Sequence, residues 1–278
     1  MLATSKAAVK PKIVLLGQND PAEQIELGPE EGPFESWLAV TQDMWGVGNL
    51  TPLDNIFAST AIGALAVTNK GIFGAVCYHL GDRLFCYSRE IGAWIDVYEG
   101  EPAVSQIQKR PKDKVKLHSW NANEHQLGKN RFTKLAVLQA SKLSGSFADL
   151  SGDCANSLKP GGNLFFADLV AGKNKTGASS PARFGKLELQ SLEDRKAALS
   201  QAGLSLCNAY DLTGDVAAAI RRGLYNSINM LAIVRTLKEP WRGQRLAAYY
   251  QELESLSRLY CSLENGDVAA AGILALKP

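Results

Sequence analysis

Short apolar runs rich in β-forming residues alternate with helical stretches through the middle of the chain, and this alternation constrains the fold more than any other feature. Five strands are predicted between residues 72 and 169, at 72–78, 94–98, 115–120, 132–139 and 163–169. Helices are predicted between several of them, at 83–91, 104–109 and 147–158. Alternation at this spacing is typical of βαβ units, in which crossover helices cover a mostly parallel sheet. The pattern therefore predicts an α/β fold.

Further elements are predicted on both sides of this region. Two helices are expected before the first strand, at 35–44 and 53–67. After the fifth strand we expect a helix at 191–202, a strand at 204–210, a largely helical stretch at 214–263 and a last strand at 267–276. The division that follows is an N-terminal extension and lid segment over residues 1–60 and an α/β domain over 61–278. The helical stretch at 214–263 is expected to cap a substrate site.

Composition and charge argue against several classes of function. The chain has 278 residues, 46% of them hydrophobic, and is long enough to bury a sizeable core. Its net charge of +2 gives no electrostatic reason to expect a nucleic acid or an anionic membrane as partner. The five scattered cysteines include no C-x-x-C pair and the three histidines form no metal-ligand pattern, which favours a reducing compartment and no metal site. No apolar run approaches the roughly 20 residues of a membrane span, so the expected location is the cytoplasm.

The segment Leu158–Gly162, Leu-Lys-Pro-Gly-Gly, carries the most specific motif. The predicted helix ends here, Pro160 prevents its continuation, and the two glycines suit a tight turn before an apolar strand. Taken alone, this is a helix-to-strand turn. The segment and the strand after it resemble the turn before the fifth strand of class I S-adenosylmethionine-dependent methyltransferases. The resemblance implies a Rossmann-like, mostly parallel seven-stranded sheet flanked by helices, with S-adenosylmethionine as cofactor.

A second segment, Met44–Pro52, supports the same resemblance. It is similar to the aromatic-Gly-x-Gly-x-Leu-Ser segment of small-molecule methyltransferases of the phosphoethanolamine and sterol or cyclopropane-lipid type. In that family the segment helps to close the site over cofactor and substrate, which implies cofactor-binding roles for Trp45 and Thr51. The glycine pair that usually follows the Ser or Thr is replaced here by Leu53 and Asp54.

The loop after the first strand departs from the family pattern. Aligned on Gly81, it has Ala75 where the family has an acid, and Cys77 and His79 where the family has glycines. Glycines at such positions let the backbone approach a cofactor and adopt positive φ without steric strain. The resemblance still places Cys77, His79 and Gly81 against the cofactor, in a loop whose chemistry has changed.

Three further positions follow from the ends of later strands. Glu99 ends the second predicted strand, where an acid about 20 residues after the glycine loop accepts hydrogen bonds from ribose hydroxyls. The alternative for Glu99 is a solvated carboxylate. The resemblance also implies that Asn121 lies near the adenine and that Gln139 faces the transferred methyl group, with a polar loop residue as the alternative for Gln139.

Two functions remain open on the sequence. One is methyl transfer from S-adenosylmethionine to a small molecule, a reaction that depends on proximity and alignment, so that no catalytic residue can be assigned. The other is a methyltransferase-fold protein without catalysis that serves as a binding or regulatory subunit, with a protein partner or a second copy of the chain. A nicotinamide-dependent oxidoreductase would need G-x-G-x-x-G after the first strand, and Cys77–Asp82 does not supply it.

Overall fold

A computed structural model describes residues 33–45, 51–78, 82–100, 114–120, 127–140, 143, 145–174, 189–237 and 241–278. The helices are α1 (Pro33–Trp45), α2 (Pro52–Leu65), α3 (Asp82–Ile91), α5 (Phe147–Ser157), α6 (Leu192–Gln201), α7 (Thr213–Val234) and α8 (Trp241–Glu264). The strands are β1 (Ile72–Cys77), β2 (Trp94–Glu99), β3 (Val115–Ser119), β4 (Phe132–Leu138), β5 (Leu158–Ala171), β6 (Ser205–Asp211) and β7 (Val268–Leu276). Each of these elements was expected from the sequence, whereas the helix predicted at 104–109 lies outside the described residues.

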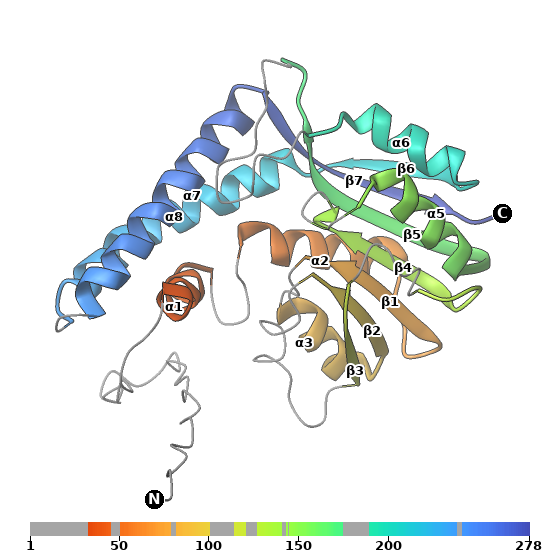
Figure 1. Ribbon diagram of the computed structural model, residues 1–278, viewed down its shortest axis with the longest axis horizontal. Coiled ribbons are helices and arrows are strands. Elements are labelled where there is room, and N and C mark those ends of the chain that lie inside the picture. Colours follow the sequence, from red (N-terminus) through yellow and green to blue (C-terminus); the bar gives the residue numbers. More distant parts are fainter. Residues whose placement is uncertain are drawn as a thin grey trace, which may run out of the picture.

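The strands form one seven-stranded sheet in the order β3-β2-β1-β4-β5-β7-β6 (Figure 1). The pairs from β3 to β5 are parallel, and β7 runs antiparallel to both of its neighbours, β5 and β6. β7 is therefore the one strand of this sheet that opposes the others. The predicted α/β fold with a mostly parallel seven-stranded sheet is confirmed.

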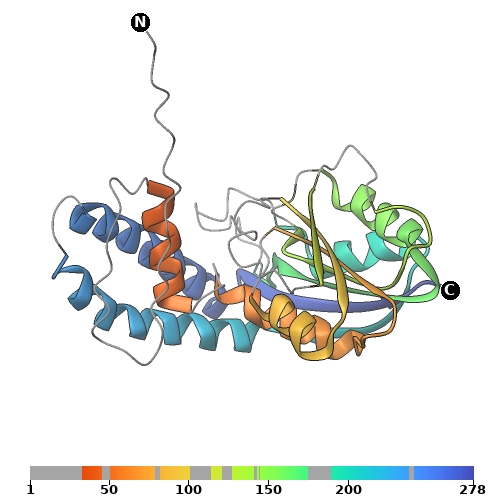
Figure 2. The same cartoon turned by 90° about the horizontal axis from the view of Figure 1, so that it is seen from below.

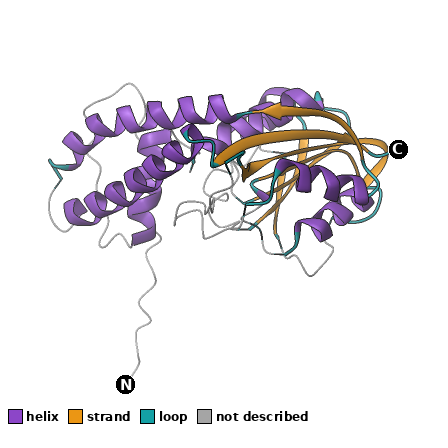
Figure 3. Cartoon of the chain, turned by 90° about the horizontal axis from the view of Figure 1, so that it is seen from above, coloured by secondary structure: helices purple, strands orange, loops and turns teal. Residues whose placement is uncertain are grey.

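Two hydrophobic cores lie on the two faces of the sheet. One contains side chains from α1, α2, α3, α7 and α8 together with alternate residues of the central strands, among them Ala75, Val97 and Leu138. The other contains side chains from α5 and α6 together with the intervening strand residues, among them Val76 and Val137. The alternation follows from strand geometry, because successive side chains point to opposite faces. The sheet is thus covered by helices on both faces (Figure 3).

The helical stretch predicted at 214–263 is present as α7 and α8, which connect β6 to β7. These two long helices contact each other and α1, and together they extend away from one end of the sheet (Figures 1 and 2). α2 crosses the predicted boundary at residue 60 and packs on β4 and β5. The division into an extension over 1–60 and a domain over 61–278 stays a prediction. Among the described helices, none has both the length and the apolar character needed to cross a membrane.

The Leu-Lys-Pro-Gly-Gly segment lies inside a strand and bulges from it. β5 begins at Leu158, which pairs with Phe132, and the next pair joins Asn163 to Lys134, so residues 159–162 form an irregularity in the ladder. Gly161 has a φ of +73°, and a Cβ on Gly162 would lie 2.8 Å from the carbonyl oxygen of Lys159. The expected need for two glycines is borne out by this geometry. The strand begins at Leu158 rather than at the predicted residue 163, because the backbone of the turn itself forms hydrogen bonds with the backbone of Lys277, which follows β7.

Polar residues on the α5–α6 face serve packing. Arg195 of α6 is buried, forms an ion pair with Asp168 of β5 at 3.9 Å, and lies over the ring of Phe147 at 4.0 Å from its centroid. A buried arginine is tolerated when a carboxylate and an aromatic face replace its water. Asp168 therefore faces away from the side of the sheet that holds α2.

Candidate functional site

Three of the side chains predicted to bind cofactor lie at the carboxyl edge of the parallel strands. Cys77 ends β1 and is paired in register with Glu99, the last residue of β2, and with Leu138, the last residue of β4. Gln139 follows directly. Cys77 belongs to the core on the α2 side of the sheet, and strand alternation puts Glu99 on that same side as Val97. The structure thus brings together the ends of three neighbouring strands, which is where ligands bind in open α/β sheets.

These side chains are withdrawn from solvent. Cys77 and Glu99 have no exposed surface and Gln139 is 1% exposed. The alternative interpretation of Glu99 as a solvated carboxylate is therefore wrong. Gln139 is a polar residue that follows β4, as its alternative had it, but its side chain is buried. Burying a carboxylate is costly unless hydrogen bonds or opposite charges compensate it. Glu99 thus lies inside the protein at the carboxyl edge of the sheet, the place where open α/β folds bind their ligands.

Asp54 is a site residue whose role was not predicted from the sequence. Its carboxylate accepts hydrogen bonds from the Thr51 N–H at 3.0 Å, from the Thr51 hydroxyl at 2.8 Å and from the Gln139 side-chain amide at 2.6 Å. Thr51 is the N-cap of α2, and its hydroxyl oxygen accepts the Leu53 N–H at 3.2 Å. The Thr-x-x-Asp spacing is a capping box, a signal that could have placed Asp54 at the first turn of a helix.

The direction of α2 explains why this capping box meets the sheet edge. Its first turn contacts Gln139 beyond the end of β4, and at its other end the Ala66 carbonyl accepts a hydrogen bond from Lys134 near the start of β4. α2 therefore runs antiparallel to β4, with its amino terminus at the carboxyl edge. The unpaired N–H groups and partial positive charge of a helix amino terminus favour the carboxylate of Asp54 there.

Gln139 is held in a strained conformation. Its φ is +56°, in the left-handed region that residues other than glycine seldom occupy. Its N–H donates to the Ala167 carbonyl at 2.9 Å and its side-chain Nε2 donates to Asp54, which fixes both ends of the residue. Its Oε1 is buried and has no hydrogen-bond partner among the described residues. Strain and an unsatisfied buried acceptor are features that concentrate at ligand sites.

The carboxylates give this edge a negative character. Burial raises the pKa of the Cys77 thiol well above its ordinary value, and the nearby charges of Glu99 and then Asp54 raise it further. The two carboxylates therefore act on the same thiol, although they come from β2 and α2. Cys77 remains a protonated, buried thiol rather than a nucleophile.

Trp45 and Thr51 line a cleft next to this network. The cleft has a volume of about 230 Å³ and lies between the end of α1, the start of α2 and the middle of α7. The Trp45 ring packs directly on Gly223 of α7, since a Cβ at position 223 would lie only 2.0 Å from the ring. Arg222 and Asn226 complete the α7 wall. The contribution of α7 agrees with the expectation that the helical stretch at 214–263 caps a substrate site, whereas its packing on Trp45 was not expected.

The remaining predicted site residues lie outside the described ranges. These are His79 and Gly81 in the loop after β1 and Asn121 after β3, together with residues 46–50 of the lid segment. Their cofactor-binding roles stay predictions. Within the described residues, no group of three or more His, Cys, Asp or Glu side chains could hold a metal ion.

No family model and no curated protein matches this sequence. Solved structures do match. Phosphoethanolamine N-methyltransferase 2 of Haemonchus contortus, in complex with phosphomonomethylethanolamine and S-adenosylhomocysteine, superposes with a TM-score of 0.72 at 12% identity over 88% of this chain and 57% of that one. The chain thus spans little more than half the length of that enzyme.

Two further structures cover most of both chains. The cyclopropane synthase MmaA2 of Mycobacterium tuberculosis has a TM-score of 0.67 at 11% identity over 87% of this chain and 94% of that one. Geranyl diphosphate C-methyltransferase of Streptomyces coelicolor A3(2), solved with Mg²⁺, geranyl diphosphate and S-adenosylhomocysteine, has a TM-score of 0.57 at 15% identity over 81% and 80%. At these identities the likeness concerns the fold. Together with the sheet described above, it shows that this chain has a class I methyltransferase-like fold.

Proposed function

We propose that this protein binds S-adenosylmethionine at the carboxyl edge of β1, β2 and β4 and transfers its methyl group to a small molecule. One observation carries the proposal: two buried carboxylates lie at the ends of these strands, Glu99 in register with Cys77 and Asp54 hydrogen-bonded to Gln139. S-adenosylmethionine has a sulfonium cation, an ammonium group and a ribose diol, all of which suit an acceptor-rich, negative site.

Glu99, Gln139 and Asp54 have different roles in the proposed cofactor site. Glu99 is placed to accept hydrogen bonds from the two ribose hydroxyls, the role of an acid at the end of the second strand. The free Oε1 of Gln139 is placed to accept a hydrogen bond from the ligand, and Asp54 holds the Gln139 amide in that orientation. When bound, the cofactor supplies an electrophilic methyl group. The protein contributes alignment, exclusion of water and a negative environment, which methyl transfer needs more than acid–base catalysis.

The ligands present in the similar structures support this proposal. The Haemonchus and Streptomyces enzymes were solved with S-adenosylhomocysteine, the product left after methyl transfer, and are named as methyltransferases of small molecules. Their acceptors differ in chemistry, so they do not indicate which acceptor this chain uses. The presence of S-adenosylhomocysteine in both structures supports S-adenosylmethionine as the proposed cofactor.

Isothermal titration with S-adenosylmethionine and S-adenosylhomocysteine tests the proposal. We expect both to bind the wild-type protein, and Glu99→Ala to weaken both by about 1–3 kcal/mol, the cost of leaving buried polar partners unsatisfied. Glu99→Gln removes the charge but keeps the shape, so it should weaken S-adenosylmethionine more than S-adenosylhomocysteine, which lacks the positive charge of the sulfonium. Glu193→Gln, at an exposed acid of α6, serves as the control and should change neither affinity.

Two outcomes would contradict the proposal at different levels. Wild-type affinity in both Glu99 variants would remove Glu99 from the cofactor site. Absence of binding of either ligand by the wild-type protein would exclude the proposed cofactor and favour the alternative of a methyltransferase-fold binding or regulatory subunit.

A further inference from the structure

The cleft between α1, α2 and α7 differs in charge from the sheet edge beside it. Arg222 of α7 is the only charged residue among the described residues that line the cleft. Its guanidinium is accompanied by the side-chain amides of Asn55 and Asn226, which can also donate hydrogen bonds. The sheet edge, by contrast, holds the carboxylates of Asp54 and Glu99. Two sites of opposite charge therefore lie next to each other.

The two sites meet at Thr51. Thr51 lines the cleft, its hydroxyl donates to Asp54 at 2.8 Å, and Asp54 in turn accepts the Gln139 amide at 2.6 Å. Two hydrogen bonds thus connect the wall of the cleft to the residue that follows β4. A molecule in the cleft would have one end near the edge of β4 and the other near α7.

The walls of the cleft suit a small molecule with one polar end. The Trp45 ring, fixed against Gly223, gives a broad apolar surface, and Met44 and Ile56 add to it. The volume of about 230 Å³ is below the roughly 300–1,000 Å³ typical of pockets for drug-sized ligands. Arg222 is exposed and lines the cleft, and its planar group of donors matches a carboxylate or a phosphate.

From these observations, and resting on the proposed methyl transfer, we propose that the cleft between α1, α2 and α7 binds the methyl acceptor by a carboxylate or phosphate group paired with Arg222. The acceptor's anionic end is then held at α7, and its other end points toward the carboxyl edge of β4. Because the two sites have opposite charges, each favours one ligand. The cationic cofactor binds beside Asp54 and Glu99, and the anionic acceptor binds at Arg222.

Arg221 provides a matched control for the experiment. It is the neighbouring residue of the same helix, is also exposed, and does not line the cleft. Inorganic phosphate is the probe, titrated into the full-length wild-type protein, Arg222→Gln and Arg221→Gln, each with and without saturating S-adenosylhomocysteine. We expect saturable binding to the wild-type protein, about five- to tenfold weaker binding to Arg222→Gln, and no change in Arg221→Gln.

The S-adenosylhomocysteine affinity of each variant, measured separately, separates this proposal from the proposed function. Unchanged affinity in Arg222→Gln supports an acceptor site. Weaker affinity, with phosphate displaced by S-adenosylhomocysteine, would assign Arg222 to the cofactor's own carboxylate and overturn the acceptor site. An equal loss of phosphate affinity in both arginine variants would also overturn the acceptor site. So would the absence of saturable phosphate binding by the wild-type protein, even if that protein binds S-adenosylhomocysteine.

Discussion

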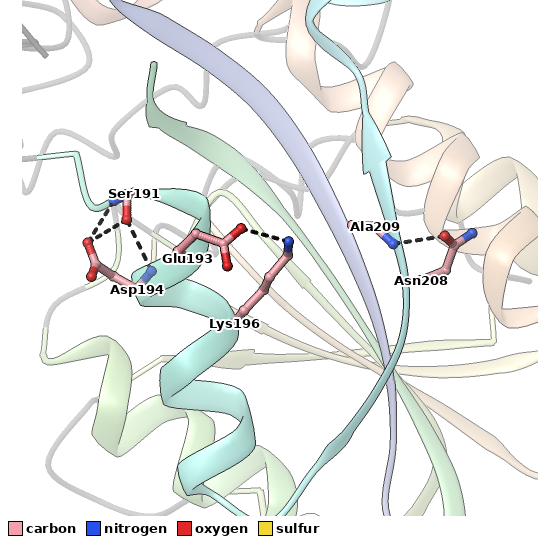
Figure 4. Close-up of polar contacts among 6 residues, drawn as sticks. All are labelled: Ser191, Glu193, Asp194, Lys196, Asn208 and Ala209. Carbon is pink, nitrogen blue, oxygen red and sulfur yellow. Dashed lines mark hydrogen bonds and ion pairs between the residues drawn. The ribbon is translucent and has the colours of Figure 1, made fainter. Parts of the chain in front are cut away.

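Two helices of this molecule begin with the same local motif and differ in everything around it. α2 starts at Thr51-x-x-Asp54 and α6 at Ser191-x-x-Asp194, and in both the hydroxyl and the carboxylate satisfy each other's backbone N–H groups. At α6 the box is exposed, and its neighbours on the surface are the Glu193–Lys196 ion pair at 2.8 Å (Figure 4). At α2 the box is buried, and its carboxylate also holds Gln139.

The two capping boxes differ in what their carboxylates contact outside the helix. Either motif is sufficient to start a helix, so the local sequence alone does not distinguish them. What distinguishes them is the third partner of the α2 carboxylate, a strained glutamine from a distant strand end. A helix cap becomes part of a candidate ligand site when the fold places a strand edge against it.

The largest expected contrast concerns cysteine reactivity in the two regions. Cys77 is buried beside the α2 box, whereas Cys207 is exposed on β6, next to α6. A raised pKa keeps the Cys77 thiol protonated as the pH rises through the ordinary range for cysteine, so its reactivity should not increase between about pH 7 and pH 9. We expect Cys77 to react with a maleimide at least about a thousandfold more slowly than Cys207.

Peptide mapping by mass spectrometry after timed labelling measures both rates in one sample. Adding denaturant should abolish the difference, which controls for peptide detection. Comparable rates in the folded protein would mean that the site edge opens readily to solvent.

The next contrast concerns stability. Asp54→Ala removes the acceptor of three buried hydrogen bonds and leaves the Gln139 amide unsatisfied, so we expect the free energy of unfolding to fall by about 3 kcal/mol. Asp194→Ala removes the equivalent contacts where water replaces them, with an expected loss of about 0.5–1 kcal/mol. Urea denaturation of the two variants measures the difference. Equal losses would show that burial adds nothing to the α2 box.

The smallest effect is expected for the ion pair beside the exposed box. Glu193→Gln breaks the contact with Lys196, but the Glu193 side chain is 78% exposed, so the change in unfolding free energy should stay below about 0.5 kcal/mol. The same urea titration, repeated at high salt, checks it. A loss as large as that of Asp54→Ala would contradict the view that solvent exposure separates the two motifs.

The sequence predicted the order of elements well because each depends on local periodicity. The strand ends also placed Cys77, Glu99 and Gln139 at one edge of a parallel sheet. Asp54 escaped prediction because its role depends on α2 lying antiparallel to β4, a tertiary contact between distant segments. A lid at 1–60 and a cap at 214–263 were predicted, but the way in which α1, α2 and α7 together line the cleft was not, since it also depends on contacts between distant segments. The cytoplasmic location, the lack of a nucleic-acid partner and the oligomeric state stay predictions.

The position of β7 has a consequence for the order of assembly. In the sheet β6 pairs with β7 alone, yet α7 and α8 separate the two strands along the chain. During synthesis β6 therefore emerges well before its partner, and closing so long a connection makes this pairing a slow, late step. Because α7 follows β6 in the chain and forms a wall of the cleft, we expect the parallel half of the sheet to form before the cleft is complete.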